Sequence, residues 1–154
     1  MTNNIKQTTN NKGFTLIEIM VAIGIVLILS GISWAGFIKY QPSLALSAIA
    51  RSLTTDLRSV QQLAVTEQIN HGIFFNISNN QYQLEKINAG TVILSVKNLP
   101  ANVVFCGITG LFENRAEFNP YGSALYSGSV CLTNANGQTK IIDIKPSGFV
   151  KIQN

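Results

Sequence analysis

The stretch from Ile19 to Ile38 carries no charged residue, and it constrains this chain more than any other feature of the sequence. As an α-helix, a stretch of this length spans roughly 30 Å, which matches the hydrocarbon thickness of a bilayer. Lys6 and Lys12 precede it, and positive charge before a first membrane segment keeps that end in the cytoplasm. The sequence therefore predicts a single-pass protein of the inner membrane, with the rest of the chain on its far side.

Glu18 stands immediately before this apolar run, where a carboxylate facing lipid costs on the order of 3 kcal/mol or more unless it finds a partner. One interpretation is that Glu18 is simply the polar edge of an ordinary membrane anchor and has no role of its own.

A secretory signal peptide is another interpretation of the N-terminal segment, since the small residues Ser33 and Ala35 would place cleavage before Gly36. The length of the apolar run argues against it, because the run continues to Ile38.

The segment KGFTLIEIMVAIGIVLIL resembles the N-terminal signature of type IV pilin-like proteins, with Gly13, Phe14 and Glu18 in the same register. The resemblance implies that residues 1–13 are a leader, which a prepilin peptidase cleaves between Gly13 and Phe14 before Phe14 is N-methylated. It also implies that residues 14–40 remain as a transmembrane helix and become the core of a filament. Glu18 is then expected to pair with the α-amino group of Phe14 in the growing filament, which gives the acid an opposite charge.

Residues 41–154 are predicted to form a periplasmic globular pilin domain that begins with an amphipathic helix to about residue 69. Apolar residues recur there at helical spacing, which predicts a helix face covered by a sheet; they are Leu46, Ala50, Leu53, Leu57, Val60 and Ala64. Asp56 and Arg58 lie off this stripe and are expected on a solvated face. Recognition of a partner by these two residues is the alternative.

After Asn70 the pattern becomes that of short strands separated by turns. HGIFFNI and QYQLEKI flank the turn SNN, with Ile73, Phe75 and Ile77 on one face, and GTVILSV and ANVVFCG bracket KNLP. GSVCLTN and TKIIDIK flank ANGQ, GFVKI is a short last strand, and residues 107–128 are predicted to be rich in loops. The fold class is therefore α+β, a long N-terminal helix packed on a C-terminal antiparallel β-sheet domain. This order of elements resembles the GspH/FimT branch of pilin-like proteins.

Cys106 and Cys131 are the two cysteines of the chain, and both fall in the predicted periplasmic part. An even count in an oxidising compartment predicts a disulfide, which would stabilise the fold by roughly 3 to 4 kcal/mol in the chain-entropy model. Two buried free thiols are the alternative. With His71 as the single histidine, the chain offers no recognisable zinc ligand set, and no metal or cofactor is expected. No enzyme motif is present: His71 is expected as a polar junction residue, and Glu113 and Glu117 as solvated loop residues.

The C-terminal end carries the candidate residues for nucleic-acid binding. Some FimT-like proteins take up DNA and carry a Gly-Arg-x-Arg motif near the C-terminus. The corresponding stretch here begins with Gly148 but has Phe149 and Lys151 in place of the two arginines. Lys140, Lys145, Phe149 and Lys151 are therefore candidates for weak DNA binding, with Phe149 stacking on a base. A core-facing Phe149 with solvated lysines is the alternative.

Together these features predict a minor pilin, a filament subunit of a type IV pilus that assists pilus initiation and DNA uptake in natural transformation. The alternative is a GspH-type pseudopilin of a type II secretion system, because both assemblies use the same stem. The expected partners are other pilins or pseudopilins in the filament, the prepilin peptidase, the inner membrane and, weakly, DNA.

Overall fold

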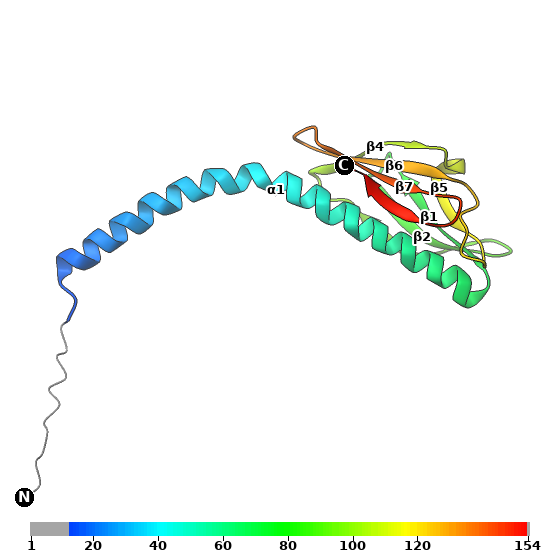
Figure 1. Cartoon of the computed structure of the whole chain (residues 1–154), viewed down its shortest axis with the longest axis horizontal. Coiled ribbons are helices and arrows are strands. Elements are labelled where there is room, and N and C mark those ends of the chain that lie inside the picture. Colours follow the sequence, from blue (N-terminus) through cyan, green and yellow to red (C-terminus); the bar gives the residue numbers. More distant parts are fainter. Residues whose placement is uncertain (1–12, 154) are drawn as a thin grey trace, which may run out of the picture. The chain divides into compact units, whose positions relative to one another are not determined.

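The computed structural model describes residues 13–153, except for the side chains of residues 32–39, and it divides into two units, residues 1–39 and 40–154. Helix α1 (Leu16–Glu67) contributes to both units and contains Pro42 (Figure 1). The predicted leader lies outside the described residues except for Gly13. The predicted transmembrane segment, residues 14–40, lies partly outside the described side chains.

The first unit is the apolar beginning of α1. Thr15 stands before the first helical residue, and its hydroxyl oxygen accepts a hydrogen bond from the backbone N–H of Glu18 at 3.3 Å. A Thr followed three residues later by Glu is the usual sequence of a helix N-terminal cap. Between Leu16 and Leu29, large apolar side chains then cover the helix on all sides and are exposed, from 77% at Leu16 to 50% at Ile19. Among the described side chains, no helical stretch is both long enough and apolar enough to cross a membrane.

The second unit contains two four-stranded antiparallel sheets in the described chain. The order in the first sheet is β3 (Thr91–Asn98), β2 (Gln81–Ile87), β1 (Asn70–Asn76) and β5 (Arg115–Phe118). The order in the second sheet is β4 (Val103–Thr109), β6 (Gly128–Asn134), β7 (Thr139–Ile144) and β8 (Val150–Gln153). A short 3-10 segment, η1 (Phe112–Asn114), precedes β5. The predicted α+β class, with a long helix and antiparallel strands, is confirmed.

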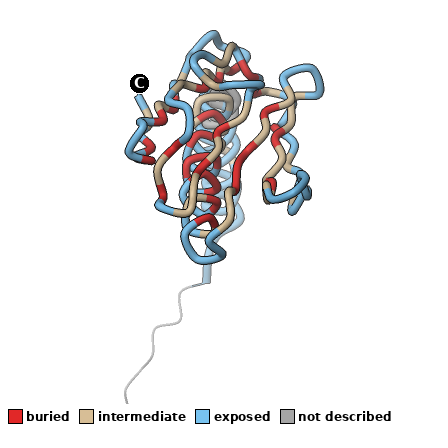
Figure 2. Tube along the Cα trace, turned by 90° about the vertical axis from the view of Figure 1, so that its right-hand side faces the viewer, coloured by how far each residue is buried: buried red, intermediate tan, exposed pale blue. Residues whose placement is uncertain are grey.

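The second half of α1 forms the centre of the core. All six apolar residues of the predicted stripe are at most 2% exposed, which confirms the face expected from their spacing. Strand residues with fully buried side chains surround them, among them Ile73, Phe75, Leu132 and Ile142. Figure 2 shows buried positions following one side of this helix and the strand segments around it. Since burial of apolar surface contributes about 25 cal/mol per Å², packing of this face against the strands stabilises the second unit.

One local prediction is wrong, and the structure adds detail on two further segments. Ile77 lies beyond the end of β1 and is 42% exposed, so it does not share the buried face of Ile73 and Phe75. The segments that bracket KNLP do not pair, because β3 and β4 are edge strands of different sheets. Residues 107–128 are rich in loops, as predicted, but they also contain β5, whose Ala116 and Phe118 are buried in the core. The predicted hairpins β1–β2 and β6–β7 are confirmed.

Candidate functional site

The N-terminal motif lies at the start of α1. Gly13 and Phe14 precede the helix in exposed backbone, which is where proteolytic cleavage concentrates. Glu18 lies in the first helical turn, and its side chain is exposed. A negative charge in this turn interacts favourably with the positive end of the helix dipole. In a single chain, Glu18 therefore supports the helix start together with Thr15.

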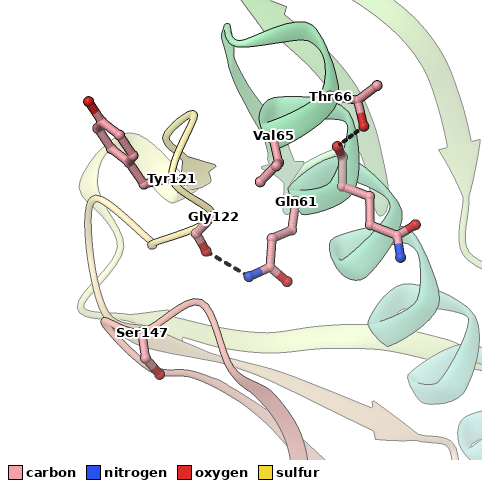
Figure 3. A pocket seen from close by; sticks show the side chains of 7 residues that line it. Gln61, Val65, Thr66, Tyr121, Gly122 and Ser147 are labelled. Atoms are coloured by element: carbon pink, nitrogen blue, oxygen red, sulfur yellow. Dashed lines mark hydrogen bonds between the residues drawn. The ribbon is translucent and has the colours of Figure 1, made fainter.

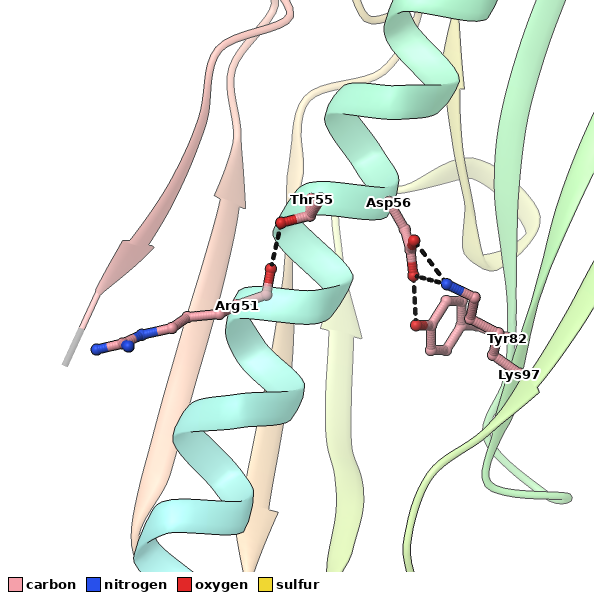
Figure 4. A network of polar contacts seen from close by, with 5 residues as sticks. All are labelled: Arg51, Thr55, Asp56, Tyr82 and Lys97. Atoms are coloured by element: carbon pink, nitrogen blue, oxygen red, sulfur yellow. Dashed lines mark hydrogen bonds and ion pairs between the residues drawn. The ribbon is translucent and has the colours of Figure 1, made fainter.

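Asp56 was expected on a solvated face, but it is only 9% exposed. Its carboxylate accepts hydrogen bonds from the Tyr82 hydroxyl at 2.6 Å and from Lys97 Nζ at 2.7 Å (Figure 4). Burial, together with the hydrogen bond and negative charge of Asp56, raises the pKa of Tyr82 well above its usual range. A buried carboxylate is costly unless it is paired or hydrogen-bonded, and Asp56 finds its partners on the two strands. The contacts therefore join α1 to β2 and β3. Asp56 is therefore a structural residue, whereas Arg58 is exposed as expected.

Strand β3 exposes apolar side chains along the free edge of its sheet. Between Asn88 and Val96 the chain carries no charge, and the exposed apolar residues are Val92, Ile93, Leu94 and Val96, at 47% to 58%. Lys97, the one charged residue of the strand, turns toward Asp56. Edge strands are usually protected by charges or prolines, so an uncharged apolar edge indicates a surface that contacts other proteins.

A groove runs between the second half of α1 and the C-terminal strand β8. We call it the α1–β8 groove; it is lined by Arg51, Thr54, Thr55, Arg58, Phe149, Val150, Lys151 and Ile152, with a volume of about 420 Å³. A neighbouring depression continues along the helix past Gln61, Gln62 and Ser147. It leads to a third hollow beside Val65 and the exposed Tyr121 (Figure 3).

The turn between β7 and β8 fixes one wall of this groove. Gly148 adopts a positive φ of 80° and donates its N–H to the Lys145 carbonyl at 2.9 Å. From the helix, Gln61 Nε2 donates to the Gly122 carbonyl at 2.6 Å (Figure 3). Arg58 donates to the Val150 carbonyl at 3.4 Å, on the side of β8 that faces α1. These two hydrogen bonds hold α1 against the loop at Gly122 and against β8.

The candidate residues near the C-terminus do not gather in one place. Phe149 is 58% exposed, so its core-facing alternative is wrong; Val150, at 2%, takes the core position. Lys151 is exposed and lines the α1–β8 groove beside Phe149. Lys145 forms an ion pair with Asp143 at 2.7 Å and does not line the groove, and Lys140 lies on β7, half-buried, outside it.

Arg51 and Arg58 complete the cationic lining, and sequence reasoning did not assign them to the same site as Phe149 and Lys151. A partial signal was present in the sequence, because residues seven positions apart lie on the same face of a helix. The spacing alone could not show that this face borders β8, since Val150 is 92 residues from Arg58.

The remaining candidates are structural. Cys106 and Cys131 form a disulfide that joins β4 to β6, with their Cα atoms 5.1 Å apart. His71 is fully buried at the junction of α1 and β1, with Nδ1 2.9 Å from the Ile69 carbonyl and Nε2 3.4 Å from Glu67. The hydrogen bond from Lys86 lowers the pKa of Glu67. Within the described residues, no three His, Cys, Asp or Glu side chains gather as a metal site would require.

Comparison with known proteins supports the motif and the fold. The prokaryotic N-terminal methylation motif matches residues 8–34. Comparison with curated proteins finds no similar sequence. The minor pseudopilin EpsH from the Type 2 Secretion System of Vibrio cholerae has a similar structure, with a TM-score of 0.61 and 9% identity, over 70% of this chain and 95% of that chain.

The type IV minor pilin FimU of Pseudomonas aeruginosa is also similar in structure. Its TM-score is 0.59 at 13% identity, over 71% of this chain and 88% of that chain. At such identities the likeness establishes the fold and leaves the biological role open. The predicted resemblance to type IV pilin-like proteins is confirmed in the N-terminal motif and in the fold of the globular unit.

Proposed function

Starting from a pilin-like motif joined to a pilin-like fold, we propose that this protein is a minor pilin, a filament subunit that takes part in initiating a type IV pilus. The observation that carries the proposal is the exposure of apolar side chains on all sides of residues 16–29, in the segment 14–40 that we call the stem. A helix that is apolar on all sides needs lipid or other helices around it. In this proposal residues 14–40 lie in the inner membrane before assembly and in the filament core afterwards, while residues 41–154 face the periplasm.

The N-terminal motif supplies the chemistry of assembly in this proposal. The prepilin peptidase cleaves between Gly13 and Phe14, and the new α-amino group of Phe14 is methylated. Once stems pack together, Glu18 is removed from water, and the cationic terminus of a neighbouring subunit provides its opposite charge. Glu18 therefore selects the register in which a new subunit docks.

Two features of the globular unit support this location and role. A disulfide such as Cys106–Cys131 persists in an oxidising compartment, which fits a periplasmic domain. The uncharged edge of β3 provides an apolar surface for contact with neighbouring subunits. The disulfide and the apolar edge of β3 fit a subunit of a pseudopilus as well as a subunit of a pilus.

The second candidate is a GspH-type pseudopilin of a type II secretion system. The TM-scores with EpsH and FimU, 0.61 and 0.59, are too close to favour either assembly. A part in DNA uptake has support from Phe149 and Lys151, which lie together, but not from Lys145, which is paired with Asp143. Loss of surface pili in a strain that lacks this protein would favour the pilus, and retention of secreted proteins in the periplasm would favour the secretion system.

Processing gives the direct test of the pilin proposal. Protein extracted from the membrane should begin at N-methylated Phe14, as measured by intact mass and N-terminal sequencing. Gly13→Leu should leave the leader attached, and this variant tests processing alone because a Cβ at Gly13 meets no other atom within 4 Å. A mature protein that begins at Gly36 would establish a secretory signal and exclude the filament stem.

A further inference from the structure

In the globular unit, most charged side chains form ion pairs, but some cationic side chains do not. Within the described part of this unit, ion pairs join Asp56 to Lys97, Glu67 to Lys86, Glu85 and Glu113 to Arg115, and Asp143 to Lys145. Arg51, Arg58 and Lys151 form no such pair there, and all three line the α1–β8 groove. The uncompensated positive charge of the unit is therefore concentrated in one groove.

The groove also presents an apolar contact at its border. The side chain of Phe149 is 58% exposed, whereas the side chain of the next residue, Val150, is buried in the core. Figure 4 shows the side chain of Arg51 extended away from the Asp56 network, on another side of the helix. Asp143 lies opposite Lys151 on β7, but its carboxylate is already in contact with Lys145 and Gln153. The groove lining therefore combines one exposed aromatic ring with three cationic side chains.

We propose that the α1–β8 groove binds a short acidic segment of a partner protein in extended conformation. The carboxylates of this segment pair with Arg51, Arg58 and Lys151, and an apolar side chain of the segment packs on Phe149. Arg51 and Arg58 are seven residues apart, or about 10 Å along the helix, which an extended chain covers in about three residues. Guanidinium groups bind carboxylates through paired hydrogen bonds, which favours arginine for this contact.

The continuation of the groove suits a peptide better than a nucleic acid. Beyond Arg58 the lining becomes neutral and polar, with Gln61, Gln62 and Ser147. Such side chains can hydrogen-bond to a peptide backbone but add no charge for further phosphates. Three cations would neutralise only a few phosphates, so nucleic-acid binding would be weak and would fall steeply with salt. The inference goes beyond the proposed filament role, since it concerns the globular unit and does not depend on the stem.

The test uses the full-length protein in detergent micelles and a short fluorescent peptide in which Glu alternates with Leu. Binding is followed by fluorescence anisotropy, with a peptide that has Gln in place of Glu and a labelled oligothymidylate as comparisons. The acidic peptide should bind more tightly than both. Arg51→Gln combined with Lys151→Gln should weaken its binding about tenfold, or about threefold for each exposed pair removed. Phe149→Ala should weaken it about threefold.

Lys140→Gln is the matched control, because it removes the same charge from the same end of the chain but outside the groove, and it leaves the Asp143–Lys145 pair beside Lys151 intact. It should leave binding unchanged. Arg58 is kept in every variant because it also hydrogen-bonds to the Val150 carbonyl. Equal binding of the Glu and Gln peptides, or an equal loss in Lys140→Gln, would overturn the proposal. Tighter binding of the oligothymidylate would replace the acidic partner with a nucleic acid.

Discussion

Two glycines with similar backbone angles differ in what surrounds them. Gly148 and Gly137 have φ values of 80° and 74°, a region that other residues enter only with strain. A Cβ at Gly148 would collide with the Gly122 carbonyl oxygen and with Gln61 Nε2, whereas a Cβ at Gly137 would meet no atom within 4 Å. Backbone strain is therefore common to both positions, and steric exclusion is found only at Gly148.

Gly148→Ala should consequently destabilise the protein much more than Gly137→Ala. We expect about 1 kcal/mol for Gly137→Ala from the backbone alone, and about 3 kcal/mol or more for Gly148→Ala, because the turn must also move away from α1. Urea unfolding followed by circular dichroism measures both. Since this turn carries Phe149, Gly148→Ala should also disturb the α1–β8 groove. Equal losses for the two variants would mean that the turn relaxes without cost.

At the level of elements, a buried ion pair links β2 to β5. Glu85 is 4% exposed, and Arg115 Nε lies 3.0 Å from its carboxylate. Burial raises the pKa of Glu85, and the positive charge of Arg115 partly offsets this effect. The Arg115 guanidinium also lies 5.8 Å from the centre of the Phe74 ring on β1. Arg115 thus compensates a carboxylate that the fold has already removed from water.

Arg115→Gln should therefore destabilise the fold by about 3 kcal/mol at pH 7, because it leaves a buried charge without a partner. The pKa of Glu85 in the folded state then rises further above the unfolded value of 4.5. In the window between these two pKa values the folded form binds more protons, so the free energy of unfolding falls as the pH rises. Unfolding at pH 4.5 and at pH 7 should show the smaller loss at pH 4.5.

The double variant Arg115→Gln with Glu85→Gln is the control for this effect. It removes the unpaired charge while keeping the shape of both side chains, so it should recover much of the lost stability and the pH dependence should disappear. A loss in the single variant that is the same at both pH values would show that packing of Arg115 on Phe74, and not charge, is responsible.

The elements that could be predicted are those whose signal is local. The stripe from Leu46 to Ala64 repeats with the helical period, and the turns SNN and ANGQ identify two hairpins. Strand β5 was missed because four residues, RAEF, offer too short an alternation. The division of strands between two sheets could not be read either, because β3 and β4 are consecutive in the chain and differ only in their distant partners.

The same limit applies to the candidate sites. Asp56 looked solvated because its partners, Tyr82 and Lys97, lie 26 and 41 residues away. Phe149 and Lys151 were found through a motif, but Arg51 joined them only when the fold placed α1 beside β8. A local pattern identifies which face of an element is apolar or charged. The tertiary structure decides what that face meets.

At the level of the whole molecule, the two units differ in where their apolar side chains lie. The globular unit buries its apolar residues in its own core, whereas the stem leaves them exposed around the helix. In the proposed function, this apolar surface is what drives insertion of the stem into lipid or its packing with other stems. Apolar contact alone does not fix the axial register between two stems, because side chains of similar size recur along the length of the stem. A charged residue at a single position can fix this register.

Glu18→Gln separates these two contributions. It should insert into the membrane as well as the wild type, because it makes the stem less polar, and Thr15 still accepts the hydrogen bond that caps the helix. It should nevertheless enter filaments poorly, at about a tenth of the wild-type amount or less, since a stem without the carboxylate leaves a buried amino group unpaired at a cost above 1.4 kcal/mol. Glu18→Asp keeps the charge and should assemble better than Glu18→Gln. Immunoblots of membrane and sheared-filament fractions measure both steps. Normal recovery of Glu18→Gln in filaments would mean that the stems find their register through packing alone, and that Glu18 serves only the helix start.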